Sequence, residues 1–477
     1  MIVLYNPPSS ANRKPILPMS LLALGAVLEG KQEYIIVDGN LTDDPVRALD
    51  AAITEHDAHI LGVTVMPGPQ LADAVPTCEA IKARHPNLKI IWGGYFPTQH
   101  YDVCLKANYV DYVVRGHGER SFVQLCDVLL RGGQPLDIPG IAYVDSSGAL
   151  IDSTPAPIPE PRELPTFPYN KVDMERYIRR TFMGERTLSH HSSYGCPFFC
   201  NFCAVVNMVN GRWKAQTAAQ VAYTVRHLVT TYEADAVEFY DNNFFTSEKR
   251  VAEFSQRIMD LGIGWWGEGR IDTMLAYEDT TWQLMADSGL RMVFLGAESG
   301  SDETLQRMDK GGRASTEKTL EIAAKMASYD IVPEMSFVVG NPPNPEADTA
   351  QTLDFIRKVK RINPRTEVII YTYTPVPLAG ELYDQARADG FAFPETLEAW
   401  IGEDWQEFIQ RRSAHTPFMH DPIRRRVRNF ERVLNAYYPT STDTSLTPAR
   451  RLLLRTISAW RYHLRVYNSP LELRVMH

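Results

Sequence analysis

Three of the six cysteines in this chain of 477 residues lie within eight positions of one another. Cys196, Cys200 and Cys203 stand in the order Cys-x-x-x-Cys-x-x-Cys within SSYGCPFFCNFCAV (192–205). Thiolates at these spacings suit three corners of an iron–sulfur cubane, whose protein ligands are usually four cysteines. A cluster held by three would leave one iron free to coordinate a small molecule, which favours catalysis over simple electron storage.

A structural zinc site is the alternative for this loop. Zinc usually has four protein ligands in such sites, and His190 and His191 are the nearest candidates for the fourth. The two cysteine spacings and their position after a strand favour the cluster. Cys78, Cys104 and Cys126 lie singly on helical stretches and are predicted to be buried structural thiols.

Other residues with chemical potential stand at the ends of predicted strands. Asp241, Arg270, Glu298 and Gly340 each follow or close a β-rich run. Ligands of parallel sheets and barrels bind at the carboxyl ends of the strands, and an arginine there is able to pair a carboxylate bidentately. The alternative for the three charged residues is a buried ion-pair network at the barrel mouth.

Two series of alternating strands and helices must position these residues. In the first series, apolar runs predict strands at 2–6, 34–40, 59–66, 88–94 and 109–116. Helical stretches such as 17–30 and 71–85 separate them. This alternation predicts βαβ units and a doubly wound parallel sheet, so the fold class is α/β.

The second series follows a stretch at 153–168 that has six prolines in sixteen residues, which predicts a stiff linker. Its predicted strands are 187–195, 236–244, 262–272, 292–300, 333–342 and 367–377. Helical stretches such as 217–233 and 314–330 lie between them, and this order predicts a full or partial parallel barrel.

We therefore expect four parts: a doubly wound domain (1–150), a linker (151–180), a barrel (181–394) and a helical, Arg-rich segment (395–477). From Arg411 onward, 13 arginines and no lysine against 4 acidic residues give +9, although the whole chain carries −9. A solvated helical face is the first interpretation of this segment. Contact with an anionic substrate, a membrane surface or an acidic partner is the alternative.

Composition and charge exclude several classes of protein. The N-terminus, MIVLYNPPSS, lacks the features of a secretory signal, and no run of about 18 apolar residues predicts a transmembrane helix. The net charge argues against nucleic acid as the main partner. We expect a cytoplasmic protein, in a reducing compartment where clustered cysteines bind metal or do chemistry.

The cysteine loop YGCPFFCNFC resembles the cluster loop of the radical S-adenosylmethionine (SAM) superfamily. The later stretches VEFYDNNFF, GEGRID, FLGAESGSDETLQRMDKG, FVVGNPPNPEADT and PVPLAGELYDQARADG resemble its strand-end motifs in order. The resemblance covers about residues 1–400, and VEFYDNNFF is similar to the subset with an N-terminal cobalamin domain. It implies a [4Fe-4S] cluster on Cys196, Cys200 and Cys203, and SAM bound at the open iron and cleaved to a 5′-deoxyadenosyl radical.

The resemblance also implies roles for residues around SAM. Phe202 is expected near the adenine, and Glu298 is expected to hold the methionyl amine or the ribose. Asp241 and Asn242 are expected near the same ligand, and the backbone at Gly340 is expected to line the adenine site.

The first domain resembles the cobalamin-binding domains of this family in LPMSLLALGAVLE, VTVM, WGGYFPTQH and RGHGERSF. Gly93 and Gly94 would let the corrin or its nucleotide tail pass close to the backbone. The lower face of cobalt is expected to carry either water or a side chain near Val65 and Met66. Glu119 matches the last position of the family's R-G-E-G-E pattern, in which His117 replaces the first Glu.

His59 belongs to a D-x-H-x-x-G pattern at 57–62, which is the motif in which a histidine ligates cobalt. That motif should follow the first strand and open a helix, whereas here it follows a helix and begins a strand. We therefore predict that His59 is a strand-entry residue and that cobalamin is bound without histidine ligation.

These features predict a cobalamin-dependent radical SAM enzyme, with C-methylation of an unactivated carbon as the leading reaction. An oxidative cyclisation or rearrangement without methyl transfer, similar to anaerobic porphyrin ester cyclisation, is the alternative. A non-catalytic iron–sulfur protein is a third, and it would need a fourth cluster ligand. The expected partners are a small-molecule substrate, anionic or lipid-like, and an electron donor such as a flavodoxin or ferredoxin.

Overall fold

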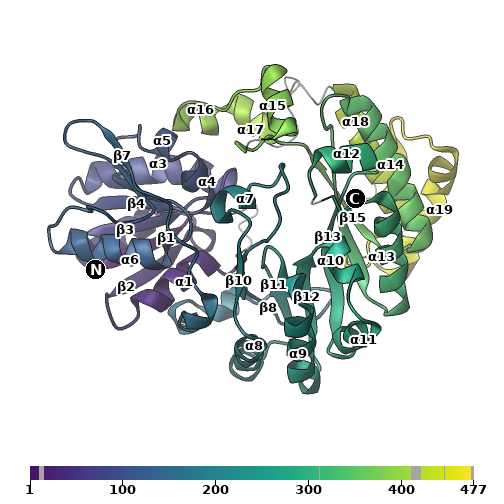
Figure 1. Cartoon of the computed structure of the whole chain (residues 1–477), viewed down its shortest axis with the longest axis horizontal. Coiled ribbons are helices and arrows are strands. Elements are labelled where there is room, and N and C mark those ends of the chain that lie inside the picture. Colours follow the sequence, from purple (N-terminus) through teal and green to yellow (C-terminus); the bar gives the residue numbers. More distant parts are fainter. Residues whose placement is uncertain (10–14, 311, 379, 410–420, 445, 474–477) are drawn as a thin grey trace. The chain divides into compact units, whose positions relative to one another are not determined.

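The computed structural model (Figure 1) describes residues 1–9, 15–310, 312–378, 380–409, 421–444 and 446–473. The chain forms two compact units, each assembled from several segments. Unit 1 comprises Met1–Tyr177, Asn207–Gln216 and Phe393–Gln410. Unit 2 comprises Ile178–Val206, Thr217–Ala392 and Arg411–His477.

Unit 1 contains a seven-stranded sheet in the order β2-β1-β3-β4-β5-β6-β7. Its five parallel strands are β1 (Ile2–Asn6), β2 (Tyr34–Asp38), β3 (Ile60–Thr64), β4 (Lys89–Gly93) and β5 (Tyr112–Val114). Because β2 and β3 lie on opposite sides of β1, the direction of winding reverses between β1 and β3. The predicted doubly wound parallel sheet is confirmed, and ligands of such sheets bind at this reversal.

Helices cover both faces of this sheet because successive side chains of each strand point to opposite faces. The helices are α1 (Met19–Leu28), α2 (Pro45–Glu55), α3 (Pro69–Arg84), α4 (Tyr95–Gln99), α5 (Tyr101–Cys104) and α6 (Gly118–Leu130). Val3 and Leu61 pack in a core with residues of α2 and α3. Leu4 and Ile60 pack in a second core with residues of α1 and α6.

Two antiparallel strands, β6 (Ile141–Val144) and β7 (Leu150–Asp152), extend the sheet beyond β5 and were not predicted. Asp145 shapes their hairpin, since its carboxylate accepts hydrogen bonds from the backbone N–H of Ser147 (2.8 Å) and Ala149 (3.0 Å). Strands this short give too little alternation to be seen in a sequence, and antiparallel edges on parallel sheets are common.

The proline-rich stretch and two later segments complete unit 1. The prolines form no long helix or strand, and the Tyr177 hydroxyl just beyond them donates to Asp38 (2.7 Å). The later segments supply β10 (Trp213–Ala215), α16 (Leu397–Ile401) and α17 (Glu403–Ile409). Trp400 of α16 packs with Phe96 (ring centroids 4.9 Å apart) and His100 (4.6 Å) in the core beside α3.

Unit 2 contains a six-stranded parallel sheet in chain order, β8-β11-β12-β13-β14-β15. The strands are β8 (Thr187–His190), β11 (Ala236–Phe239), β12 (Gly264–Gly269), β13 (Leu290–Glu298), β14 (Val332–Val339) and β15 (Glu367–Thr372). Every neighbouring pair is parallel, which confirms the predicted partial (β/α) barrel.

The connecting helices lie along the outer side of this sheet (Figure 1). They are α8 (Ala218–Tyr232), α9 (Glu248–Ile258), α10 (Ile271–Leu275), α11 (Asp279–Asp287), α12 (Asp302–Arg307), α13 (Thr316–Ser328) and α14 (Pro345–Ile362). A further helix, α15 (Glu381–Ala388), follows the last strand. Trp265 packs outward against Phe254 of α9 (5.4 Å), whereas Trp266 packs inward with Met292 and Val332. The inner face is therefore distinct from the outer core.

The described part of the C-terminal segment contains two long helices, in agreement with the predicted helical segment. α18 (Asp421–Tyr437) packs on α14, and α19 (Pro448–Leu464) packs on α18. Among the residues described, no helix is long and apolar enough to cross a membrane.

We predict that Trp400→Ala will release the returning segment of unit 1. Removing this buried indole should lower the free energy of unfolding of unit 1 by about 3–5 kcal/mol, because a cavity is left in the core. A glutamate-specific protease should then cleave at Glu395, Glu398 or Glu403. The matched control is Trp460→Ala, since that indole is half exposed. An unchanged cleavage pattern in the Trp400 variant would contradict the packing described.

Candidate functional site

The three cysteines occupy one loop between β9 (Ser193–Gly195) and α7 (Val205–Val209). Gly195 ends the strand with φ +79°, a left-handed conformation that favours glycine. All three thiols are free, and the Cys200 side chain is buried while Cys196 and Cys203 are half-buried. The loop is closed by a hydrogen bond from the Cys203 N–H to the Cys200 carbonyl (3.0 Å).

Asn201 anchors this loop to the end of α12. Its N–H donates to the Met308 carbonyl (3.2 Å), and its side-chain amide donates to the Arg307 carbonyl (2.6 Å). Gly380 packs against the other side, where a Cβ would lie 2.9 Å from that of Asn201. Phe202, expected near the adenine, is half-buried on the same loop, so part of its ring is open to a ligand.

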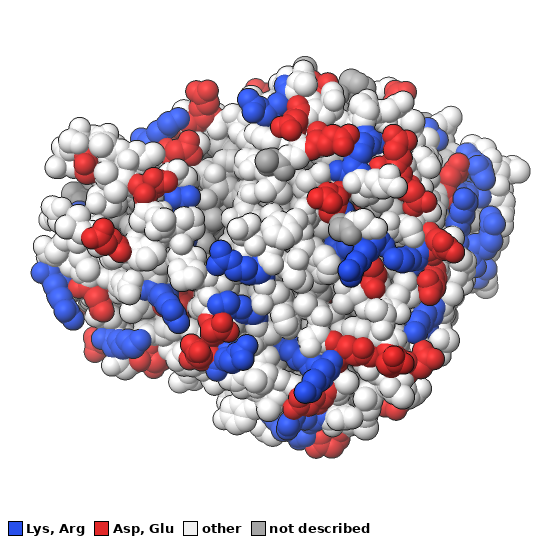
Figure 2. Space-filling model, viewed as in Figure 1, with Lys and Arg blue, Asp and Glu red and all other residues white. Residues whose placement is uncertain are grey.

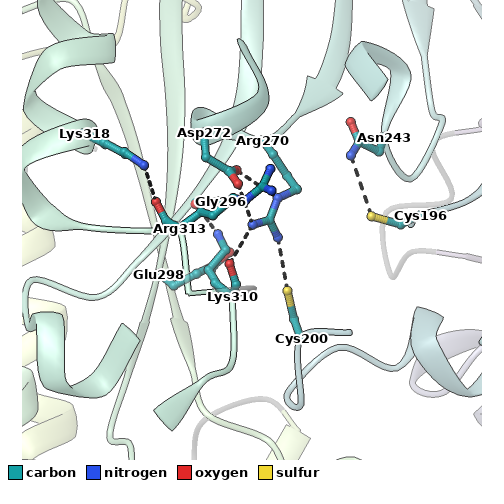
Figure 3. A network of polar contacts seen from close by, with 10 residues as sticks. All are labelled: Cys196, Cys200, Asn243, Arg270, Asp272, Gly296, Glu298, Lys310, Arg313 and Lys318. Atoms are coloured by element: carbon teal, nitrogen blue, oxygen red, sulfur yellow. Dashed lines mark hydrogen bonds and ion pairs between the residues drawn. The ribbon is translucent and has the colours of Figure 1, made fainter. Parts of the chain in front are cut away.

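Arg270 links the end of β12 to the cysteine loop (Figure 3). Its guanidinium donates to both oxygens of Asp272 (2.9 and 3.1 Å), to the Cys200 sulfur (3.3 Å) and to the Lys310 carbonyl (2.9 Å). It also lies 3.7 Å from the ring centroid of Phe198. The predicted bidentate pairing exists, but its carboxylate is that of Asp272 and not that of a ligand.

Glu298 pairs with a lysine that the sequence analysis did not identify. Lys310 donates to the Glu298 carboxylate (3.0 Å) and to the Gly296 carbonyl, and both side chains are more than 90% buried (Figure 3). The register of β13 shifts between Gly296 and Glu298, and Glu298 has φ +62°. A Cβ on Gly296 would lie 2.1 Å from the Glu298 carboxylate. The bulge and the glycine thus aim Glu298 at Lys310.

Asp241 lies at the end of β11, as predicted, but its carboxylate is enclosed. It accepts hydrogen bonds from the Ser192 N–H (3.1 Å), the Ser192 hydroxyl (2.8 Å) and the Ser193 hydroxyl. Arg250 donates to the same Ser192 hydroxyl, and burial lowers the pKa of this arginine. The group braces the chain that enters the cysteine loop, whereas Asn242 is exposed. Cofactor contact by Asp241 and Asn242 stays a prediction.

Asn243, one residue further along, is a second contact that sequence reasoning missed. Its buried side-chain amide lies 3.7 Å from the Cys196 sulfur and donates to it (Figure 3). The repeated Asn in FYDNNFF was the available signal, although it did not distinguish the exposed residue from the buried one. Side-chain N–H groups therefore reach two of the three sulfurs.

Burial makes the unliganded thiols poor acids. It raises the pKa of Cys200, despite the opposing charges of Lys310 and Arg270, and raises that of Cys203 to about 12. Metal ligation requires thiolates, and cations beside Cys200 favour the thiolate form. This donor set of three thiols with two N–H donors fits a sulfur-rich cluster.

The zinc alternative lacks its fourth ligand. The His190 ring packs edge-on against Phe239 (6.3 Å) and the His191 ring against Tyr194 (5.3 Å). Within the described ranges, no group of three or more His, Cys, Asp or Glu residues is arranged to hold a single metal ion. A preformed mononuclear site with either histidine is therefore not supported.

The end of β14 offers a buried acceptor. Gly340 has φ +81°, and the next residue, Asn341, is held through its N–H (3.2 Å) and side-chain amide (2.9 Å) by Asp348. Asp348 also accepts from Ser299 (3.2 Å) and Thr304 (3.0 Å), which ties the turn to the segment after β13. The Asn341 side-chain oxygen is buried without a hydrogen-bond partner in the described residues. A donor such as the amino group of adenine would satisfy it.

The inner face of the sheet carries acidic side chains that resist ionisation. Burial, followed by the charges of Asp241 and Glu334, raises the pKa of Glu268 to about 8. Burial also raises the pKa of Glu334, although Trp266 donates to it (2.9 Å). Glu268 is therefore a neutral hydrogen-bond donor at pH 7, and its sequence motif gave no sign of this.

In unit 1, glycines and small turns line the carboxyl ends of β3 and β4. Gly94 has φ +98°, and a Cβ there would lie 3.1 Å from the backbone of Val65. A Cβ on Gly93 would have 3.8 Å of clearance, and Met66 is half exposed nearby in sequence. The absence of large side chains at Gly93 and Gly94 leaves space for a flat, bulky ligand such as a corrin at this edge of the sheet.

Glu119 and His59 lie at opposite ends of this sheet. Glu119 is buried in the first turn of α6, after β5, and its Oε2 has no hydrogen-bond partner among the described residues. An amide N–H, of which cobalamin carries several, would satisfy it. His59 precedes β3 and is largely exposed beside Asp57 (3.9 Å). The prediction that His59 is a strand-entry residue is confirmed.

Comparison with known proteins identifies both regions. Residues 13–126 match the B12 binding domain and residues 191–356 match the radical SAM superfamily. The chain is 25% identical over 367 residues to "Uncharacterized methyltransferase PH0819" of Pyrococcus horikoshii, covering 75% of this chain and 78% of the relative. It is 24% identical over 377 residues to the anaerobic magnesium-protoporphyrin IX monomethyl ester cyclase of Synechocystis, covering 76% and 72%.

A solved structure shares the fold. It is that of the cobalamin-dependent S-adenosylmethionine radical enzyme OxsB with aqua-cobalamin and S-adenosylmethionine bound. The TM-score is 0.70 at 15% identity, with 100% of this chain and 74% of OxsB covered.

We predict that Lys310→Met will destabilise unit 2 by about 3–5 kcal/mol, because it leaves the Glu298 carboxylate buried without its cation. Adding Glu298→Gln should recover part of the loss. Lys318→Met is the control, since its hydrogen bond to the Arg313 carbonyl is exposed. Urea denaturation measures the wild type and all three variants. Equal stability of the Lys310 and Lys318 variants would exclude the pair as a buried brace.

Glu268→Gln should change how stability depends on pH. The folded protein keeps the Glu268 proton up to about pH 8, whereas the unfolded chain loses it near the ordinary value of 4.5. The wild type therefore loses stability as the pH rises from 4.5 to 8, and the variant does not. The difference between the two pKa values, about 3.5, corresponds to about 5 kcal/mol, so the melting temperature of the variant should gain about 10 °C on the wild type over this range. Glu317→Gln is the control, since Glu317 is exposed on α13. The difference in melting temperature between this variant and the wild type should stay constant over the same pH range.

Proposed function

Because this chain is a radical SAM protein with an N-terminal B12-binding domain, we propose that it is a cobalamin-dependent C-methyltransferase. Its substrate would be a small biosynthetic intermediate with an unactivated carbon. The observation that carries the proposal is the loop of Cys196, Cys200 and Cys203, in which polar side chains already reach two sulfurs. The relative named as a methyltransferase, matched over most of both chains, supports methyl transfer.

In this proposal the three cysteines hold a [4Fe-4S] cluster. Arg270 and Asn243 would donate to its thiolate ligands, as they do to the free thiols. The Arg270 charge would offset that of an anionic cluster, while Asp272 fixes its orientation. These donors and the buried surroundings would exclude water from the sulfur atoms.

SAM would lie beside the cluster against the ends of β13 and β14. Glu298 would accept the methionyl ammonium through the oxygen that Lys310 does not contact. Asn341 and the backbone of Gly340 would hold the adenine, and the open side of Phe202 would pack against it. Together, bound cluster and SAM supply a hydrogen-abstracting adenosyl radical, and bound cobalamin supplies a methyl group.

Cobalamin would bind unit 1 at the carboxyl ends of its parallel strands. Gly93 and Gly94 would allow close approach to the backbone, and Glu119 would accept an amide N–H. Met66 would lie near the lower face of cobalt. His59 would take no part, because it lies at the amino end of β3.

The chain's own acid–base groups would then act on the substrate. Glu268, neutral near pH 7, would donate a hydrogen bond to a polar group of the substrate on the inner face. A carboxylate group of the substrate would be unfavourable beside Glu268, since burial disfavours the charged form of a carboxyl group there. We propose a cytoplasmic enzyme with a flavodoxin or ferredoxin as electron donor and an anionic or lipid-like substrate.

An oxidative cyclisation without methyl transfer is the second candidate. The relative named as an anaerobic magnesium-protoporphyrin ester cyclase supports it, with nearly the same identity and coverage as the methyltransferase relative. The cysteine loop and the cobalamin edge are equally compatible with either reaction. Only the fate of the SAM methyl group separates them.

The test is anaerobic reconstitution with iron, sulfide and cobalamin, followed by SAM labelled in its methyl group. We expect cluster absorbance, release of 5′-deoxyadenosine under reduction, and label recovered on cobalamin. Cys200→Ala should abolish release of 5′-deoxyadenosine, whereas Cys126→Ala, a buried thiol of unit 1, should preserve it. Release of 5′-deoxyadenosine without label on cobalamin would favour cyclisation. Release by the Cys200 variant would refute the cluster assignment.

A further inference from the structure

The C-terminal helical pair exposes a concentration of apolar side chains. The described part of the chain has seventeen exposed large hydrophobic residues, and six of them lie in 452–471, on α19 and just after it. They are Leu452, Leu453, Trp460, Leu464, Val466 and Leu471. Single exposed hydrophobic residues are normal, but a contiguous patch marks an interaction site.

Helical geometry gathers three of these on one face of α19. Leu453, Trp460 and Leu464 are seven and four residues apart, so they lie above one another on the same side. They are 49%, 49% and 69% exposed. The opposite side of the helix, with Leu454 and Tyr462, is buried against the rest of unit 2. The outward face of α19 therefore carries a strip of large apolar side chains, beside the exposed polar residues Thr456 and His463.

Arginines flank this face. Arg450 and Arg455 lie on α19 itself, where Arg455 also packs over the Tyr437 ring (5.5 Å). Arg465 follows the helix and pairs with Asp354 of α14 (3.1 Å). Figure 2 shows Lys and Arg side chains gathered along the right-hand edge, where Figure 1 draws α14 and α19. The described residues of 421–473 contain ten arginines against four acidic residues, which leaves +6. One of those acids, Glu472, is already paired with Arg461.

We propose that the outward face of α19 is a docking surface for a membrane rich in anionic lipid. An apolar face flanked by arginines is what an interfacial helix presents to headgroups and the outer acyl chains. At 17 residues α19 spans about 25 Å, too short and too charged to cross the bilayer, so it would lie in the plane of the surface. This inference is independent of which reaction the enzyme catalyses.

A second copy of the chain fits this face less well. In a two-fold dimer the same patch meets itself, so Arg450 and Arg455 would approach the arginines of the other copy without facing acidic residues from α19, which has none. An anionic surface is complementary to both features at once. The apolar strip then contributes burial, and the arginines contribute attraction that depends on ionic strength.

The full chain should be tested by flotation with vesicles. We expect binding to phosphatidylcholine vesicles that contain phosphatidylglycerol and much weaker binding to phosphatidylcholine alone. Leu453→Glu with Leu464→Glu should reduce the partition coefficient at least about tenfold, because two apolar side chains lose their burial. Arg450→Gln with Arg455→Gln should reduce it about fivefold for each arginine at low salt, and high salt should remove this difference.

The matched control is Leu136→Glu, since Leu136 in unit 1 is 68% exposed and should not affect binding. Trp460 fluorescence should shift to the blue on binding, and Trp460→Phe should remove that shift. Equal binding by the double Leu variant would overturn the proposal. So would an absence of binding to either vesicle, or a dimer in sedimentation that the double Leu variant dissociates.

Discussion

Charges buried beside the cysteine loop must find partners within the protein, and this requirement organises unit 2. Removing an ion from water costs several kcal/mol, so each buried cation needs a carboxylate and further hydrogen bonds. Arg270 takes Asp272, and Lys310 takes Glu298. Arg270 also donates to the Lys310 carbonyl, so the two pairs are joined. The short stretch that carries Lys310 follows α12, whose end holds Asn201, so closing the pairs also places the cysteines.

The backbone around these pairs adopts conformations that would be unfavourable alone. Glu298 has a positive φ after a shift in strand register, and Gly296 leaves space that any side chain would fill. A non-glycine residue in this region costs of order 1–3 kcal/mol and persists only where its surroundings determine it. The ion pair between Glu298 and Lys310 holds the backbone in this conformation. The strain and the pairing are thus one feature, located where a ligand at the cysteine loop would meet β13.

The sequence predicted the order of the strands and the cysteine loop because both rest on local patterns. It also found Arg270, Glu298 and Asp241, which stand at strand ends, but not their partners. Lys310 reaches Glu298 only through the return of the chain after α12, and Asn243 differs from exposed Asn242 only in direction. The start of the predicted C-terminal segment (395–477) was grouped with the helices that follow it, yet Phe393–Gln410 belongs to unit 1. These contacts depend on tertiary packing, which the spacing of residues in the sequence does not predict.

The electrostatics of unit 2 divide the site into two zones with different tasks. Cations and N–H donors face the sulfur atoms, where a thiolate-bound cluster would bring negative charge. Further along the inner face, Glu268 keeps its proton near pH 7 because burial and the charges of Asp241 and Glu334 raise its pKa, and burial also raises the pKa of Glu334. These two carboxyl groups offer no positive charge that would stabilise an anionic substrate group. They would suit a neutral substrate group that accepts hydrogen bonds. A largely apolar substrate drawn from a membrane surface would satisfy this inner face, while any anionic group on it would have to lie elsewhere.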